Sequence, residues 1–241
     1  MTLTVHAGHN PDGKIACGAV GFVKESTMAR EIKDEIVRLV KLTKVGIYDI
    51  TVEDGTSQSN ILTRLANNAN RVKADLNLSI HLNAGANQKE TDGKTTGVEC
   101  WIYPRSKSRE YAEKICDAIS ALGFKNRGVK ENASYYILKK TAKPTIIVEC
   151  CFVDDPDDCQ ILDTKAVARA IVGAILGYIP EDEPVKTEDQ EAKAPGAESV
   201  SMTKNEVFYR VQVGSYRNKE NAERLKADLI RAGFDGIIVR S

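Results

Sequence analysis

The stretch that decides the fold is Thr145-Ile146-Ile147-Val148-Glu149-Cys150-Cys151-Phe152. Its short, continuous apolar run, opened by Pro144, predicts a buried strand. Glu149 does not fit that environment, because an unpaired carboxylate is costly to bury. Such a group is normally paired with a cation, bound to a metal, or shifted in pKa for acid–base chemistry. Glu149 is therefore the first candidate functional residue.

Two other predicted strands end near histidine. Leu76–Leu82 contains His81, and the strand at Leu3–Val5 runs into His6-Ala7-Gly8-His9. Strand ends that carry histidine and glutamate predict a metal site at one edge of a sheet. Each feature alone has an ordinary alternative: a solvated turn, a structural histidine, or half of a buried ion pair.

The other elements alternate along the chain. Further strands are predicted at Ile47–Val52 and Val98–Tyr103, and a loop with a short extended piece at Tyr135–Leu138 is predicted between Phe124 and Lys140. Helices are predicted at Met28–Val40, Ser57–Ala74, Lys107–Leu122 and Lys165–Tyr178, the first with Ser26 or Thr27 as its N-cap. This alternation predicts an α/β fold, with a mostly parallel twisted sheet and helices on both faces.

The composition changes after residue 179. Residues 1–179 form one predicted domain, and residues 180–205, rich in Glu, Asp, Lys, Pro, Ala and Ser, predict a flexible linker. Residues 206–241 predict a short α+β segment of one strand, one helix and one strand. That segment is shorter than the roughly 40 residues below which a domain usually needs help to fold.

Charge and hydropathy exclude several classes of protein. The 34 basic and 34 acidic residues give a formal net charge of zero, so nothing indicates a nucleic-acid partner. No apolar stretch is long enough for membrane insertion, and no signal peptide is visible, which predicts synthesis in the cytoplasm. The six cysteines show no C-x-x-C spacing and are expected to be reduced core thiols.

The candidate residues suit a hydrolytic metal site. Catalytic zinc sites typically use three protein ligands and leave a fourth position for water. His9, Glu25 and His81 can supply that set from three separate elements, and Glu149 then remains for acid–base work. The ligand types alone leave iron and manganese open as well.

Several segments together carry a family resemblance. They are Gly8-His9, Gly21-Phe22-Val23-Lys24-Glu25, Ser79-Ile80-His81-Leu82-Asn83, Asn126-Arg127-Gly128-Val129-Lys130 with the following Tyr136-Ile137-Leu138, and the opening stretch Pro144–Phe152. In this order, residues 1–178 resemble the zinc-dependent N-acetylmuramoyl-L-alanine amidases of the amidase-3 type, found in bacterial autolysins and phage endolysins.

The resemblance implies roles for four residues. His9, Glu25 and His81 would bind Zn²⁺, and Glu149 would be the catalytic glutamate. The implied reaction is hydrolysis of the amide bond between N-acetylmuramic acid and L-alanine in peptidoglycan, which causes cell wall lysis. Zinc would polarise the carbonyl and hold the water, while Glu149 would take the water's proton and deliver it to the leaving amine.

The resemblance also places substrate-side residues. Arg127 and Lys130 would bind carboxylates of the muramyl peptide, with Asn83 beside them; a solvated basic loop is the alternative for the two cations. His6 stands where the family has no ligand and is expected to support the others. The sequence Asn10-Pro11-Asp12 departs from the family's glycine-rich loop, which puts the shape of that loop in question.

The end of the chain resembles a second family. Phe208–Tyr216, Asn221-Ala222-Glu223 and Gly233-Phe234 are similar to the first half of a sporulation-related repeat (SPOR) domain, a module that binds denuded glycan. The half module would either pair with a second copy in a homodimer or be a remnant. The whole chain fits a phage or prophage endolysin acting on the cell wall, with a host autolysin as the alternative.

Two other classes of function remain open on the sequence. One is a zinc peptidase that cuts within the peptidoglycan stem peptide, and the other is a non-catalytic cell-wall-binding protein. Analysis of the digestion products separates the peptidase from the amidase. A Glu149→Ala change that leaves function intact would identify the binding protein.

Overall fold

A computed structural model describes residues 1–180 and Lys226. Its strands are β1 Thr2–Ala7, β2 Gly46–Asp49, β3 Leu76–Asn83, β4 Val98–Ile102, β5 Asn126–Glu131 and β6 Thr145–Phe152. Its helices are α1 Glu25–Lys41, α2 Gln58–Arg71, α3 Arg109–Ser120, α4 Tyr136–Lys140, α5 Pro156–Ile161 and α6 Thr164–Leu176. The predicted linker after Pro180 and, Lys226 excepted, the predicted segment 206–241 lie outside the described residues.

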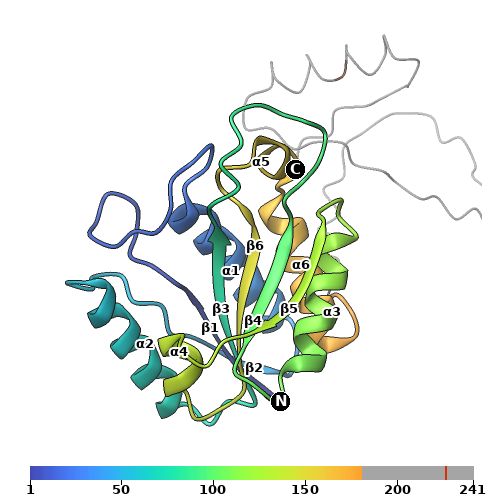
Figure 1. Cartoon of the computed structure of the whole chain (residues 1–241). Helices are drawn as coiled ribbons and strands as arrows, with labels where there is room; N and C mark the ends of the chain where they lie inside the picture. Colours follow the sequence, from blue (N-terminus) through green and yellow to red (C-terminus); the bar gives the residue numbers. More distant parts are fainter. Residues whose placement is uncertain (181–225, 227–241) are drawn as a thin grey trace, which may run out of the picture. The chain divides into compact units, whose positions relative to one another are not determined.

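The strands form one six-stranded sheet in the order β2-β1-β3-β6-β4-β5 (Figure 1). β1, β2, β3 and β6 are parallel, whereas β4 runs antiparallel to β6 and β5 runs parallel to β4. The apolar stretch quoted first is therefore an interior strand, β6, with β3 on one side and β4 on the other. The prediction of a mostly parallel sheet is confirmed.

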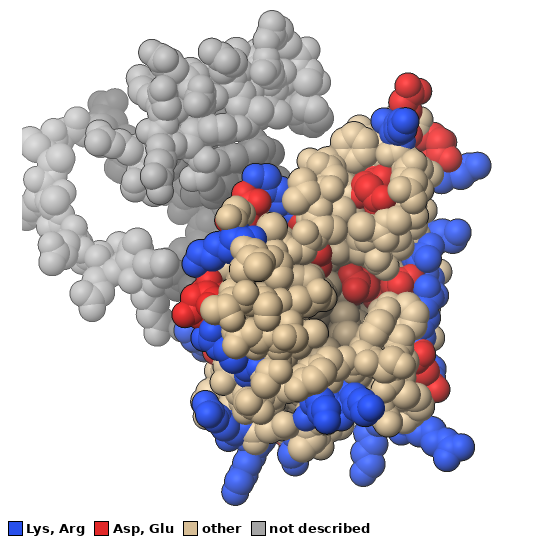
Figure 2. All heavy atoms as spheres, turned by 60° about the vertical axis from the view of Figure 1, so that its left-hand side comes forward, with Lys and Arg blue, Asp and Glu red and all other residues tan. Residues whose placement is uncertain are grey.

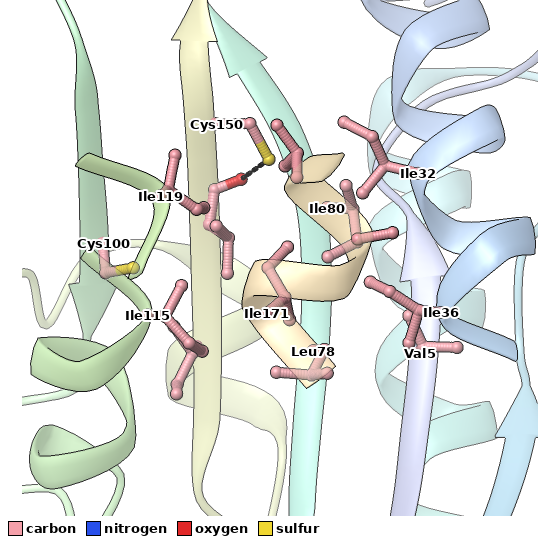
Figure 3. Packing of buried hydrophobic residues seen from close by; sticks show 14 of the residues in the cluster. Val5, Ile32, Ile36, Leu78, Ile80, Cys100, Ile115, Ile119, Cys150 and Ile171 are labelled. Carbon is pink, nitrogen blue, oxygen red and sulfur yellow. Dashed lines mark hydrogen bonds between the residues drawn. The ribbon is translucent and has the colours of Figure 1, made fainter. Parts of the chain in front are cut away.

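Helices cover both faces of this sheet, as the alternation predicted. The main core packs α1, α3 and α6 against one face, with side chains such as Ile80, Ile171 and Val148 completely buried (Figure 3). A smaller cluster on the other face joins α2 and α4 to Ile147. Within residues 1–180, no helix is both long and apolar enough to cross a lipid bilayer.

The two faces of β6 and its neighbours differ in polarity. Successive side chains of a strand point to opposite faces. Val148 and Cys150 therefore face the main core, where the Cys150 thiol donates to the Val148 carbonyl. All six cysteines are free, and four of them are buried: Cys100, Cys116, Cys150 and Cys151. Ile147 and Glu149 point to the opposite face of the sheet, where α2 and α4 pack. The Glu149 carboxylate therefore lies on that face and not in the main core.

Two local predictions are wrong. The first helix begins at Glu25 with Lys24 as its N-cap, two or three residues before the expected Ser26 or Thr27. The region predicted as a loop with an extended piece at Tyr135–Leu138 contains β5 and the short helix α4. β5 shows no alternating pattern because its register with β4 is irregular around Gly128, which has a positive φ of 74°.

Aspartates order the long segment between β3 and β4. Asp154 accepts backbone N–H groups of Gly85, Ala86 and Asn87. Further along, Asp157, Asp155 and Asp158 accept the N–H groups of Asp92, Thr96 and Gly97. Asp155 also caps the short helix α5, so the aspartates of Asp154–Asp158 both begin that helix and hold this neighbouring segment.

We predict that Asp158→Ala lowers the free energy of unfolding by about 2–6 kcal/mol. Asp158 is fully buried and accepts the N–H groups of Gly97 and Phe152 at 3.0 and 2.8 Å, and each donor left without a partner costs about 1–3 kcal/mol. Chemical denaturation measures the loss. The control is Asp163→Ala, which removes an exposed cap of α6 and should cost only about 1 kcal/mol. Equal losses in the two variants would contradict the prediction.

Candidate metal centre and active site

Three of the predicted site residues meet at the carboxyl ends of β1 and β3. His9 follows β1, His81 lies near the end of β3, and Glu25 is the first residue of α1. The Glu25 Oε1 atom lies 2.9 Å from His81 Nδ1 and 3.3 Å from His9 Nε2, and the two imidazole rings are edge-on. One ligand atom from each residue lies within 4.8 Å of the others. The structure thus brings together residues far apart in the sequence.

The donor set fits a divalent metal. Two imidazole nitrogens and one carboxylate oxygen are common ligands of catalytic zinc, at about 2.0–2.2 Å from the ion. Donors on one such ion are roughly 3–3.5 Å apart, which is close to the spacing between Glu25 and each histidine. His9, Glu25 and His81 could therefore hold a metal with little rearrangement.

The charges of this group are coupled. Burial alone would raise the pKa of Glu25, but hydrogen bonds with His81 and His9 outweigh it and hold that pKa well below its ordinary value. Burial likewise opposes protonation of His81, whereas Glu25 and Glu149 raise its pKa above the ordinary value. Glu25 also accepts the N–H groups of Ala19 and Leu82, which fixes its orientation. Because its pKa is lowered, the Glu25 carboxylate is held ionised.

Glycine is required at two positions around the group. A Cβ atom added to Gly8 would lie 1.8 Å from the His81 ring, so only glycine leaves space for that imidazole. Gly18 has a φ of +84°, and an added Cβ would lie 2.5 Å from Glu25 Oε2. The segment between β1 and α1 can therefore pass close to His81 and Glu25 only because positions 8 and 18 are glycine.

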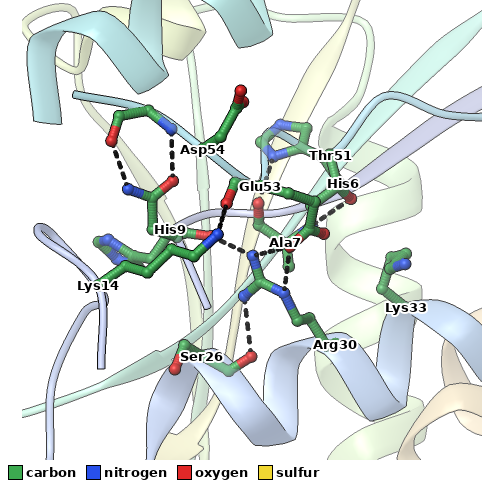
Figure 4. A network of polar contacts seen from close by, with 12 residues as sticks. His6, Ala7, His9, Lys14, Ser26, Arg30, Lys33, Thr51, Glu53 and Asp54 are labelled. Carbon is green, nitrogen blue, oxygen red and sulfur yellow. Dashed lines mark hydrogen bonds and ion pairs between the residues drawn. The ribbon is translucent and has the colours of Figure 1, made fainter. Parts of the chain in front are cut away.

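Two polar side chains anchor the segment that carries His9. Arg30 donates to the carbonyls of His9 and Ser26 and also pairs with Glu53 (Figure 4). Asn10 is completely buried, and it donates to the carbonyls of Ile15 and Gly55 and accepts the Gly55 N–H group. The residue that departs from the glycine-rich pattern is thus the one that fastens this loop.

His6 lies outside the group of possible ligands. It is buried in β1, and burial lowers its pKa to about 3, which keeps the imidazole neutral. Its Nδ1 atom lies 3.3 Å from the Ala7 carbonyl. The residues that the structure gathers as possible ligands are His9, Glu25 and His81, and His6 stays a predicted supporting residue.

Glu149 lies directly beside His81. The two residues are register partners on β6 and β3, and the pairing becomes irregular immediately afterwards, between His81 and Asn83. Such irregularities often re-aim side chains next to active sites. The Glu149 Oε2 atom is buried without a hydrogen-bond partner in the described part of the chain. Burial raises the pKa of Glu149 to about 7, against the effect of His81 and with help from Glu25 and Glu99.

The sequence analysis did not select Glu99. This residue is the antiparallel register partner of Glu149 on β4 and is 2% exposed. The available signal was the same as for Glu149, because each is the lone carboxylate in a Val-Glu-Cys run within an apolar strand. All three predicted substrate-side residues contact it: Asn83 donates to Oε1, and Arg127 and Lys130 donate to Oε2.

The face toward α2 and the segment before α1 is hollowed. Figure 2 shows this hollow with acidic side chains at its floor and mainly uncharged residues around it. Three large apolar residues of the segment before α1 are more than half exposed: Ile15, Val20 and Phe22. On the other side of the site, Tyr135 stands against Trp101 with ring centroids 5.3 Å apart. The surface near the site therefore offers apolar contacts as well as charge.

Comparisons with known proteins show the family and the fold. The N-acetylmuramoyl-L-alanine amidase family model matches residues 3–180, and the SPOR domain model matches residues 188–240, which includes most of the segment compared with SPOR above. The catalytic domain of the CD27L endolysin targeting Clostridia difficile has the same fold, with a TM-score of 0.66 and 23% identity over 75% of this chain and 99% of that one.

Two curated relatives extend the comparison. The N-acetylmuramoyl-L-alanine amidase CwlM of Bacillus licheniformis is 30% identical over 76% of this chain and 64% of its own length. The sporulation-specific N-acetylmuramoyl-L-alanine amidase of Bacillus subtilis is 26% identical over 97% of this chain and 81% of its own. The chain spans 54–64% of the length of several curated relatives that it matches. The chain belongs to the N-acetylmuramoyl-L-alanine amidase family.

Proposed function

We propose that the protein hydrolyses the amide bond between N-acetylmuramic acid and L-alanine in peptidoglycan. Family membership supports this reaction. The observation that carries it is the position of Glu149. Its Oε2 atom has no hydrogen-bond partner among residues 1–180, and its strand neighbour is His81 of the candidate metal group. A group with a pKa of about 7 is well suited to accept and return a proton near neutral pH.

We propose Zn²⁺ as the metal and His9, Glu25 and His81 as its ligands. The mixed nitrogen and oxygen donors and the nearby spare carboxylate suit hydrolytic zinc, although iron and manganese bind similar sets. When bound, zinc would polarise the amide carbonyl and make water more acidic. Metal analysis of the purified protein separates these ions.

The remaining steps belong to the chain's own residues. The Glu149 carboxylate takes a proton from the attacking water and later delivers it to the nitrogen of the leaving L-alanine. Glu25, held ionised by its hydrogen bonds, keeps His9 and His81 in position. Gly8 allows the His81 ring to sit against the end of β1.

The domain and partner assignments are also proposals. Residues 1–179 would be the catalytic domain, 180–205 a linker and 206–241 a segment that binds denuded glycan, as the SPOR match suggests. Cosedimentation of the full chain with glycan strands freed of stem peptides should deplete it from solution, and analytical ultracentrifugation should detect a homodimer if the segment pairs. We also propose that the protein acts on the cell wall as a phage or prophage endolysin, with a host autolysin as the alternative.

Digestion of purified peptidoglycan is the decisive test of the reaction. The zinc-loaded protein should release stem peptides with an L-alanine amino terminus, and a chelator should abolish release until zinc is restored. Mass analysis of the fragments identifies the bond that is cut. Cuts within the peptide would instead support the peptidase, and binding without release would support the cell-wall-binding protein.

We predict that Glu149→Gln reduces hydrolysis by about 10²–10⁴-fold, because the amide cannot accept the proton. Zinc should still raise the melting temperature of this variant, since the proposed ligands are intact; a ligand at 100 times its dissociation constant adds about 2.7 kcal/mol of stability.

The matched control is His81→Ala, which should weaken the zinc-dependent rise while circular dichroism confirms folding. Turnover retained in Glu149→Gln would refute the proposed role of Glu149. A full zinc-dependent rise in a folded His81→Ala protein would refute the ligand assignment.

A further inference from the structure

Glu99 accepts hydrogen bonds from four side chains. Its Oε1 atom accepts Asn83 Nδ2 and Trp101 Nε1, both at 3.0 Å. Its Oε2 atom accepts Arg127 Nε at 2.6 Å and Lys130 Nζ at 2.5 Å. Burial would raise the pKa of Glu99, but the hydrogen bonds from the two cations outweigh it and hold that pKa below its ordinary value. The Glu99 carboxylate is therefore ionised, and it connects these four side chains.

An irregularity in β5 brings both cations to the same carboxylate. Residues three apart in a regular strand point to opposite faces. Opposite β4, however, the pairing advances from Asn126 to Val129 while β4 advances only from Val98 to Cys100. Gly128, with its positive φ, lies within this extra length. Arg127 and Lys130 can therefore both reach Glu99.

The two cations that contact Glu99 outnumber its single negative charge by one. Arg127 and Lys130 together carry two positive charges against the single charge of Glu99, and within residues 1–180 neither cation forms another salt bridge. Arg127 uses only its Nε atom, so its two Nη groups donate no hydrogen bond among the described residues. Its guanidinium lies over the Phe152 ring, 4.9 Å from the centroid, which restrains its plane. About a third of each cationic side chain is exposed.

This arrangement is suited to a carboxylate ligand. A guanidinium binds a carboxylate through two parallel hydrogen bonds, and its Nη end is the part that remains available here. Neighbouring strands lie about 4.8 Å apart, which places β5 about 10 Å from β6 and Glu149. A carboxylate two peptide residues from the cut amide would lie about 7 Å away along an extended chain. The Arg127 side chain extends from β5 to Glu99 on β4, which shortens the remaining distance.

We propose that Glu99 is a positioning residue that orients Arg127, supported by Lys130, to bind a free carboxylate on the second residue of the stem peptide. This inference rests on the proposed amidase function and adds a substrate preference to it. Stem peptides that carry a carboxamide at that position present no charge to Arg127. They should be bound more weakly and cut less efficiently.

The test compares two synthetic muramyl peptides that differ only in a carboxylate or a carboxamide on the second residue. For the zinc-loaded full chain, kcat/KM should favour the carboxylate by about tenfold or more. Arg127→Ala should reduce kcat/KM for the carboxylate peptide and leave the carboxamide peptide nearly unchanged, so that the preference disappears. Glu99→Gln should raise KM for the carboxylate peptide with little change in kcat, and Glu99→Asp should restore part of the loss.

The control variant is Glu131→Gln, which removes the carboxylate of another glutamate–arginine pair at the end of β5, with Arg109. It should retain the preference of the native protein. Equal losses on both peptides in Arg127→Ala would assign that residue a structural role and overturn the proposal. Native kinetic parameters in Glu99→Gln would overturn the positioning role.

A binding measurement separates this inference from the proposed reaction. Calorimetry in the Glu149→Gln background gives dissociation constants for both peptides without turnover. In one outcome, the native protein cuts neither peptide at the proposed bond, yet it binds the carboxylate peptide more tightly and this difference depends on Arg127 and Glu99. That result would refute the proposed reaction and support the proposed carboxylate recognition. If both peptides are cut and bound equally, the recognition fails and the reaction stands. Absence of binding and cutting overturns both.

Discussion

The candidate site depends on one buried carboxylate held between two imidazoles. Glu25 would destabilise the fold if it were left without partners, because a buried charge is costly. His81, His9 and two backbone N–H groups supply those partners. The start of α1, the course of the preceding segment and the absence of a side chain at Gly8 and Gly18 all follow from this contact. A metal bound here would replace hydrogen bonds between ligands with coordination, so the same residues serve both states.

The sheet determines which residues can meet this group. Parallel β1 and β3 end at the same edge, and β6 continues the register from His81 to Glu149. The antiparallel β4 then brings Glu99, which lies near the start of its strand, to the level of Glu149 near the end of its own. Reversal of one strand thus extends a row of functional side chains across three strands. A fully parallel sheet would place the start of β4 at the opposite edge.

Residue patterns predicted the fold, and they selected three residues that the structure brings together, for physical reasons. Buried strands have continuous apolar runs, so an isolated Glu149 or His81 is conspicuous. The family resemblance then related His9 and Glu25 to them across long separations. β5 was missed because its irregularity at Gly128 removes the alternation that marks a strand. The N-cap was misplaced because Glu25 is fixed by tertiary contacts with histidines, which local capping preferences cannot reveal. Asn10 is fixed partly by Gly55, 45 residues away, and local sequence patterns do not reveal that contact.

Glu149 and Glu99 have the same side chain, but their different environments shift their pKa values in opposite directions. Both occupy Val-Glu-Cys runs, both lie in apolar strands, and they face each other in one register pair. Glu99 accepts four hydrogen bonds, two of them from cations, and its pKa is lowered. Glu149 has a buried oxygen without a hydrogen-bond partner in the part of the chain that the structure describes, and its pKa is raised to about 7. Two carboxylates whose environments separate their pKa values can take separate tasks. The ionised Glu99 can hold cations in place, while Glu149 remains free to exchange a proton, and the charge of the first favours protonation of the second.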